Sequence, residues 1–183
     1  MKYSLKEYLN AEIPSLSNKN GIKWLLTLWK IRRYNPSYDA IFLIRYCYVY
    51  QESGGIKKYL RKRCRRLLVN RYNIFLNIGK ESVIGKGLFL PHPTSIVIGA
   101  GVNIGDNCTI YQNVTFGAKK RSSNENQIEN LYPQIGDNCI FYANSVMIGS
   151  INVRNGTQVG ANAVLICDTE ENSIYAGVPA VKK

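Results

Sequence analysis

The stretch IGAGVNIGDNCTIYQNVTFG, residues 98–117, decides the fold of this 183-residue chain. An apolar residue returns in it at every sixth position, as Ile98, Ile104, Ile110 and Phe116. A half-buried strand would alternate with a period of two, and a helix would repeat about every 3.6 residues. The six-residue period instead predicts a coil of triangular section, in which each hexad supplies a short strand and a turn and three hexads close one rung.

The same phase continues outward from this stretch in both directions. Seven of the phase residues are followed by Gly, which accounts for nearly half of the fifteen glycines in the chain. We expect these glycines to allow backbone angles at the corners of the coil that a Cβ atom would penalise. Cys108 and Cys139, four positions after a phase residue, should pack as small buried side chains beside a corner. The thirteen phase residues are Ile78, Ile84, Leu90, Ile98, Ile104, Ile110, Phe116, Ile135, Phe141, Met147, Val153, Val159 and Leu165.

Residues 1–75 have helical periodicity and carry the whole net charge of +12. Sixteen Lys and Arg stand there against four Asp and Glu, whereas residues 76–183 hold eight of each. The spacing of Ser4 and Glu7 predicts a capping box that opens a first helix. A second helix over about 21–34 should bury one apolar stripe, and two more should follow Pro36 and Gly55. The stripe consists of Ile22, Leu25, Leu26, Trp29 and Ile31.

The fourth of these helices has a strongly basic face. The face is compatible with simple solvation, with attraction to anionic lipid or a lipid-phosphate-linked substrate, or with nucleic acid. No recognised nucleic-acid motif accompanies the charge, so a nucleic-acid partner is not expected. A peripheral membrane contact through this helix stays open. The basic residues are Lys57, Lys58, Arg61, Lys62, Arg63, Arg65, Arg66 and Arg71.

Four segments carry a family resemblance: GLFLPHPTSIVIG (87–99), NCTIYQNVTFG (107–117), YPQIGDNCIFYANSVMIG (132–149) and AGVPA (176–180). They resemble the hexapeptide-repeat acyltransferases, and most of all the serine acetyltransferase branch with its related bacterial polysaccharide O-acetyltransferases. The resemblance implies an α+β protein, with a helical segment over 1–75 and a left-handed parallel β-helix over 76–183. It also implies acetyl-CoA as co-substrate and a homotrimer, which suits a triangular prism.

The hexad period is interrupted at two places. Eight residues separate Leu90 from Ile98, so two extra residues bulge from the coil, and the chain's single histidine, His92, lies there between two prolines. Ile135 follows Phe116 by nineteen positions instead of six, and the thirteen extra residues project in a loop within 118–134. The resemblance matches His92 with the family's catalytic histidine, which would accept a proton from a hydroxyl as its oxygen attacks the thioester.

Other positions depart from the serine acetyltransferase pattern. Tyr132 stands where those enzymes have a second histidine, Asn77 where they have an aspartate, and Pro91 where they have an acidic residue. The sequence therefore favours a neutral sugar hydroxyl over zwitterionic serine. The expected acceptor contacts are Asn77, Tyr111, Gln112, Asn113 and Tyr132. The expected acetyl-CoA contacts are Phe116, Gly117, Tyr142, Ala143, Gly160 and Ala161, with Lys182 at the phosphates.

These observations predict an acetyl-CoA-dependent O-acetyltransferase that acts on a sugar or surface-polysaccharide precursor. Serine O-acetyltransferase is the alternative, and a non-catalytic scaffold built on the same coil is a third. A zinc hydratase on this coil would need three His ligands, so no metal is expected with one histidine per chain. The five cysteines include no CxxC pair and suit reduced thiols in the cytoplasm.

Overall fold

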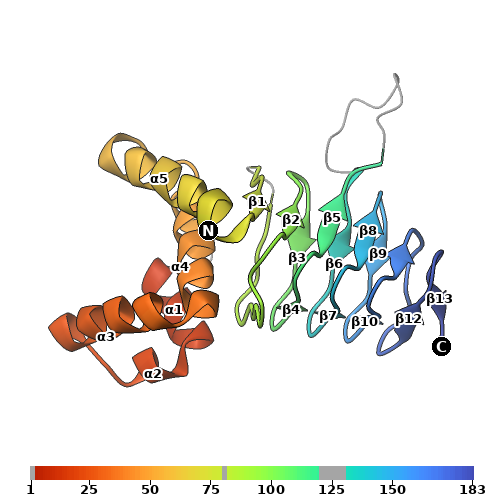
Figure 1. Ribbon diagram of the computed structural model, residues 1–183, viewed down its shortest axis with the longest axis horizontal. Helices are drawn as coiled ribbons and strands as arrows, with labels where there is room; N and C mark the ends of the chain where they lie inside the picture. Colours follow the sequence, from red (N-terminus) through yellow and green to blue (C-terminus); the bar gives the residue numbers. More distant parts are fainter. Residues whose placement is uncertain (1–2, 80–81, 120–130) are drawn as a thin grey trace.

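A computed structural model of the chain describes residues 3–79, 82–119 and 131–183. Helices gather at one end of an elongated molecule, and a coil of short strands runs from them to the C-terminus (Figure 1). This order of a helical segment before a parallel coil is the one that the sequence predicts. The helices are α1 (Leu5–Glu12), α2 (Pro14–Ser17), α3 (Gly21–Tyr34), α4 (Pro36–Val49) and α5 (Gly55–Tyr72).

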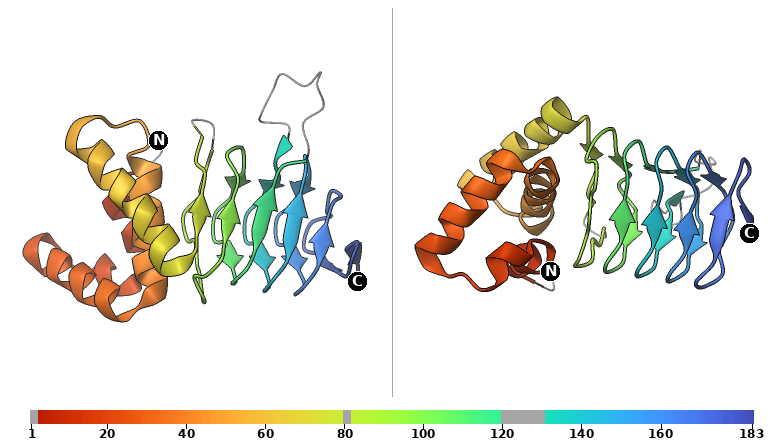
Figure 2. Two further views of the ribbon diagram at one scale, coloured as in Figure 1. Left: turned by 45° about the horizontal axis from the view of Figure 1, so that its top comes forward. Right: turned by 60° about the horizontal axis from the view of Figure 1, so that its bottom comes forward.

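The coil has three faces, each made of parallel strands contributed by successive rungs (Figure 2). The first face has the order β1-β2-β5-β8-β11, the second β3-β6-β9, and the third β4-β7-β10-β12, with β13 added antiparallel at its end. The strands are β1 (Phe75–Leu76), β2 (Val97–Ile98), β3 (Asn103–Ile104), β4 (Thr109–Ile110), β5 (Thr115–Gly117), β6 (Gln134–Ile135), β7 (Ile140–Phe141), β8 (Val146–Ile148), β9 (Asn152–Val153), β10 (Gln158–Val159), β11 (Val164–Leu165), β12 (Ile174–Ala176) and β13 (Val181–Lys182).

The predicted phase residues point into the coil, with one exception. All of those from Ile84 to Leu165 are buried, which confirms the hexad phase over that range. At the start of the coil the prediction is wrong, because Leu76, not Ile78, pairs with Ile98 in the first face. Eight residues therefore separate Leu76 from Ile84, and a second two-residue insertion precedes the one that carries His92.

The glycines that follow the phase residues do not serve the purpose expected of them. Gly99, Gly105 and Gly136 are absent from the positions with positive φ. They are needed for space, since a Cβ on Gly105 would lie 2.6 Å from the backbone of Gly136 in the next rung. The left-handed corners fall instead three residues after the phase residues and are mostly asparagines, which tolerate that conformation. These asparagines are Asn107, Asn113, Asn138, Asn144 and Asn162.

The helical segment departs from its sequence prediction at α3. Trp24 and Leu28 are the residues that α3 buries. Most of the predicted stripe faces outward instead, and Ile31 is only partly buried against the core. The ends of α1 match expectation, because Glu7 N–H donates to Ser4 Oγ at 3.3 Å in a complete capping box. The exposed members of the stripe are Ile22 (74%), Leu25 (59%), Leu26 (62%) and Trp29 (63%).

A buried ion pair joins the helices to the first rung of the coil. The Arg45 guanidinium on α4 donates to the Glu12 carboxylate on α1 at 2.9 and 3.0 Å, and both side chains are fully buried. Arg45 also donates to the carbonyl of Ile84 at 2.8 Å, while Glu12 accepts from the Leu88 N–H at 3.1 Å. Burial raises the pKa of Glu12, and the Arg45 charge opposes that rise. Each charge thus has partners on the coil as well as across the helices.

Candidate active site

His92 lies on the bulge between the first rung and β2, and its side chain is exposed. Prolines on both sides restrict the local backbone, and Thr94 N–H donates to the His92 carbonyl at 2.8 Å to close a tight turn. Ser95 has a left-handed φ of 54°, and its N–H donates to the carbonyl of Tyr72 at the end of α5 at 2.8 Å. The bulge is therefore held between the coil and the last residue of the basic helix.

From His92 toward the C-terminal rungs, two aromatic rings lie along the same edge of the three-sided coil. Tyr111 and Tyr142 follow equivalent strands of the third face, and Tyr111 N–H donates to the Phe141 carbonyl at 3.0 Å. The ring centroids of His92 and Tyr111 are 6.2 Å apart, and those of Tyr111 and Tyr142 are 5.5 Å apart and stacked. We call this the His92 edge; it comprises His92, Tyr111–Asn113, Tyr142–Asn144 and Gly160–Asn162. It brings the candidate base together with three predicted acceptor contacts, Tyr111, Gln112 and Asn113.

Gln112 and Asn113 occupy different environments on this edge. Asn113 is a left-handed corner residue whose amide donates to Asn144 Oδ1 at 2.8 Å, and Asn144 in turn donates to Asn162 at 3.0 Å. This asparagine ladder stabilises the corners. Gln112 Oε1 is buried and has no hydrogen-bond partner within the described part of the chain. An unpartnered acceptor of this kind is available to a ligand donor.

The remaining predicted acceptor contacts lie on another edge of the same chain. Asn77 and Gly99 follow strands of the first face, and Gly117 is the last residue of β5 on that face. Asn77 N–H donates to the Ile98 carbonyl at 2.9 Å. The Tyr132 ring covers Gly99, where an added Cβ would approach its Cε1 to 2.2 Å. One chain therefore does not bring Asn77 or Tyr132 together with His92. The loop residues 120–130 lie outside the described residues.

The predicted acetyl-CoA contacts are divided in the same way. Tyr142, Ala143, Gly160 and Ala161 lie on the His92 edge, one rung after another. Phe116 and Gly117 belong to β5 on the first face, and the Phe116 side chain is fully buried in the coil. Lys182, in the last strand, forms an ion pair with Glu170 through its ammonium group. That hydrogen bond raises the pKa of Lys182. A phosphate at Lys182 would compete with the Glu170 carboxylate.

A hollow at His92 is lined otherwise by residues that the sequence does not single out as a site. It has a volume of about 450 Å³, and α4 and α5 wall it opposite the bulge. One feature of the sequence could have pointed to this hollow: Arg71 is the last of the basic residues listed above and lies close to the start of the coil. The lining residues are Asn35, Pro36, Ser37, Arg71, Tyr72, Pro91, His92, Pro93 and Thr94.

The cysteines have the packing environment expected of them. Cys108 and Cys139 are fully buried, and their thiols lie 3.3 and 3.2 Å from the carbonyls of Gly136 and Arg154. The neighbouring Cys139 thiol and burial raise the pKa of Cys108, which opposes formation of a thiolate nucleophile. Among the described residues, no three His, Cys, Asp or Glu side chains gather as metal ligands, and no helix is long and apolar enough to cross a bilayer.

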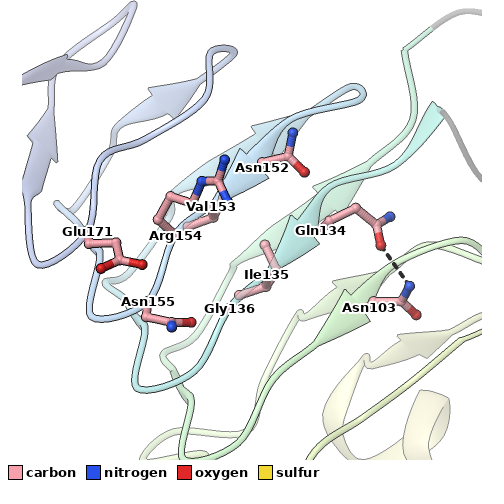
Figure 3. Close-up of a pocket in the computed structure, with 9 residues that line it drawn as sticks. All are labelled: Asn103, Gln134, Ile135, Gly136, Asn152, Val153, Arg154, Asn155 and Glu171. Atoms are coloured by element: carbon pink, nitrogen blue, oxygen red, sulfur yellow. Dashed lines mark hydrogen bonds between the residues drawn. The ribbon is translucent and has the colours of Figure 1, made fainter.

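A second hollow lies on the second face, away from the His92 edge (Figure 3). Its volume is about 280 Å³, and the outward side chains of β3, β6 and β9 line it. Asn103 donates to Gln134 Oε1 at 2.7 Å, and Gln134 donates in turn to the Gly101 carbonyl at 3.1 Å. These polar groups pair along the stack of strands, as a ladder that stabilises the face.

The comparisons with known proteins agree with this architecture. The family described as "Hexapeptide repeat of succinyl-transferase" matches residues 94–118 and 134–167, which form the central rungs. The central rungs of the chain match the hexapeptide-repeat family. It is 33% identical over 123 residues to a serine acetyltransferase of Staphylococcus aureus, covering 67% of this chain and 55% of that protein. A serine acetyltransferase of Staphylococcus epidermidis is 33% identical over 111 residues, covering 61% and 50%.

Solved structures extend the likeness to the helices. The serine acetyltransferase of Neisseria gonorrhoeae matches with a TM-score of 0.73 at 21% identity, over 98% of this chain and 66% of that one. The soybean apoenzyme matches at 0.72 and 22% identity, over 98% and 69%. At this identity the likeness shows a shared fold. The chain spans about half the length of the curated relatives that it matches.

Proposed function

We propose that this hexapeptide-repeat protein is an acetyl-CoA-dependent O-acetyltransferase with His92 as its general base. The observation that carries the proposal is the exposed His92 imidazole, held on a proline-bounded bulge at the head of the His92 edge. Serine acetyltransferases share the fold, and one of those structures is a complex with CoA. A left-handed winding of the coil belongs to this proposal.

The proposed reaction is a direct transfer. His92 accepts the proton of the acceptor hydroxyl while that oxygen attacks the thioester carbonyl, and backbone N–H groups stabilise the developing oxyanion. The imidazolium then returns the proton to the departing thiolate, so that the C–S bond breaks, the C–O ester bond remains and CoA leaves as a thiol. The residues along the His92 edge, from Tyr142 to Ala161, would bind the pantetheine arm.

We further propose that the working unit is a homotrimer. Within one chain the predicted contacts divide between the His92 edge and the edge that carries Asn77, Gly117 and Tyr132. Three-fold packing of prisms places unlike edges of two copies against each other. A complete site would then take His92 from one copy and Tyr132 from its partner.

Two acceptor classes remain, and each has a specific observation behind it. The named relatives are serine acetyltransferases, which favours serine. The residues Tyr132 and Asn77, which replace the expected loop histidine and aspartate, favour a hydroxyl of a sugar or polysaccharide precursor. Of the two, the comparisons give serine the stronger support.

A cytoplasmic location with peripheral membrane association also stays a proposal. Apart from the half-buried Arg61, the basic residues of α5 are exposed. Four apolar residues of α3, including Trp29, are exposed as well. Basic and interfacial aromatic side chains together favour anionic lipid surfaces.

The experiment that tests the function measures CoA release from acetyl-CoA by thiol detection. L-serine, nucleotide sugars and acidic and neutral oligosaccharides are supplied in parallel to the full-length protein. The proposal expects CoA release that depends on one acceptor class. Release with serine alone assigns the serine branch, and release with sugars alone assigns the sugar branch. The absence of CoA binding by calorimetry would instead favour the non-catalytic scaffold.

A further inference from the structure

The hollow beside His92 is large enough for an acceptor and carries more positive than negative charge. Arg71 lines it, and the lining residues include no Asp or Glu within the described part of the chain. The Asp39 carboxylate, almost fully buried, accepts from Arg71 at 2.9 Å, from Arg32 at 2.8 Å and from the Tyr72 hydroxyl at 3.0 Å. Two guanidinium groups therefore share one carboxylate, which leaves a surplus of one positive charge.

Arg71 retains donors beyond its ion pair. Its side chain is 53% exposed, and the bond to Asp39 uses only Nη1. A guanidinium presents five N–H donors in a planar fork, which suits a carboxylate or phosphate. The buried Asp39 holds the base of this fork in place. The arginine is thus pre-oriented for an anion without being neutralised by a carboxylate at the surface.

The N-terminus of α4, a helix of 14 residues, lines the hollow beside Arg71. The first turn of such a helix carries partial positive charge. In α4, Pro36 has no N–H and Tyr38 N–H donates to Asn35 Oδ1 at 3.3 Å, so Ser37 is the residue of this turn that can donate to a ligand. Ser37 stands in this turn, is 8% exposed, and lines the hollow. Its Oγ is buried and has no hydrogen-bond partner among the residues described. A buried hydroxyl without a partner costs free energy unless a ligand completes it.

We propose that this hollow is an anion subsite for the acceptor. A carboxylate or phosphate of the acceptor binds Arg71, Ser37 Oγ and the first turn of α4, and its hydroxyl then lies at His92. This inference rests on the proposed function for the role of His92, but the binding of the anion does not. The ammonium of free serine would meet the surplus positive charge, so an acidic sugar or a sugar phosphate fits the hollow better than the amino acid.

The single histidine makes the subsite directly observable. The imidazole Hε1 proton of His92 gives one NMR signal, which can be followed at fixed ionic strength while D-glucuronate, inorganic phosphate, L-serine or D-glucose is added to the full-length protein. Glucuronate and phosphate should shift the signal saturably, and glucose should not. If serine binds as tightly as glucuronate and depends equally on Arg71, the anionic group is an amino-acid carboxylate.

Three variants and one matched control separate the subsite from general charge. Arg71→Gln should weaken glucuronate binding at least tenfold, and Arg71→Lys should recover most of it. Arg66→Gln removes the same charge from the same helix at an exposed position outside the hollow, and should leave the affinity unchanged. Ser37→Ala removes a hydroxyl without a partner, so it should weaken binding severalfold without lowering the melting temperature.

Equal shifts with glucose and glucuronate, or equal losses in Arg71→Gln and Arg66→Gln, would overturn the subsite. If Arg71→Gln fails to fold, an unchanged affinity of Ser37→Ala for glucuronate would also overturn the subsite. The two proposals can fail separately: acceptor-dependent CoA release without anion binding removes only the subsite. Anion binding without any CoA release removes the acetyltransferase and leaves the subsite.

Discussion

The coil and the helical segment differ in where their stabilising contacts come from. In the coil a buried residue lies against its equivalents one rung away, as Ile98, Phe116 and Met147 do along the first face. In the helical segment the decisive contacts join unrelated positions, such as Glu12 with Arg45. A repeated contact is visible in a sequence as a period, whereas a single pair of distant partners is not. The bulge that carries His92 lies where these two kinds of structure meet.

The largest expected effect concerns the pair that joins the two regions. Arg45→Ala should lower the free energy of unfolding by about 3–5 kcal/mol, because it leaves the Glu12 carboxylate buried without its counter-charge. Urea unfolding followed by circular dichroism measures the loss. The paired variant Glu12→Gln with Arg45→Met removes both charges and should lose less than Arg45→Ala alone. A loss below about 1 kcal/mol in Arg45→Ala would show that the regions are not joined through this pair.

The next effect tests the stacking of the coil. Met147 is fully buried in β8, whereas its neighbour Ile148 is 38% exposed. Met147→Ala should cost about 2–5 kcal/mol through lost burial and the cavity it leaves. Ile148→Ala changes the adjacent residue on the outer surface and should cost about 0.5 kcal/mol. Similar losses at the two positions would contradict the inward phase.

The smallest expected effect on stability concerns α3. Leu26 is 62% exposed and Leu28 is 7% exposed, although both are leucines on the same helix. Leu26→Ala should change the free energy of unfolding by less than about 0.5 kcal/mol, and Leu28→Ala should cost at least 2 kcal/mol. Thermal unfolding of the two variants makes the comparison. A large loss in Leu26→Ala would show that another surface covers the exposed stripe in solution.

The sequence predicts the coil well because each six-residue repeat forms one side of the coil, so the period of the sequence directly gives the period of the structure. From Ile84 to Leu165 the burial of each phase residue follows from its position in the repeat. The sequence places Ile78 in the hexad phase, whereas Leu76 takes that position in the structure. The two-residue insertion after Leu76 is not visible in the sequence, because no complete hexad precedes it. The purpose of the glycines was also misjudged, because the closeness of two rungs is a property of stacking rather than of the local chain.

The candidate site was predictable only in part. His92 is predictable because it interrupts the period and matches the family's histidine, and Tyr111 because a tyrosine side chain can hold a neutral sugar hydroxyl. Arg71 and Ser37 belong to helices whose packing angle no pattern states, so their approach to His92 could not be foreseen. The separation of Tyr132 from His92 within one chain could not be read from the sequence either, since a linear resemblance does not say on which edge of the coil each residue lies.

The most direct test of the whole account is the rate of CoA release by His92→Ala with the accepted acceptor. Because the His92 side chain is exposed, the variant should keep the melting temperature of the parent protein. Its turnover should fall about 100-fold or more, as expected on removal of a general base. A folded variant that transfers acetyl groups at nearly the parental rate would contradict the assignment of His92 and the mechanism built on it.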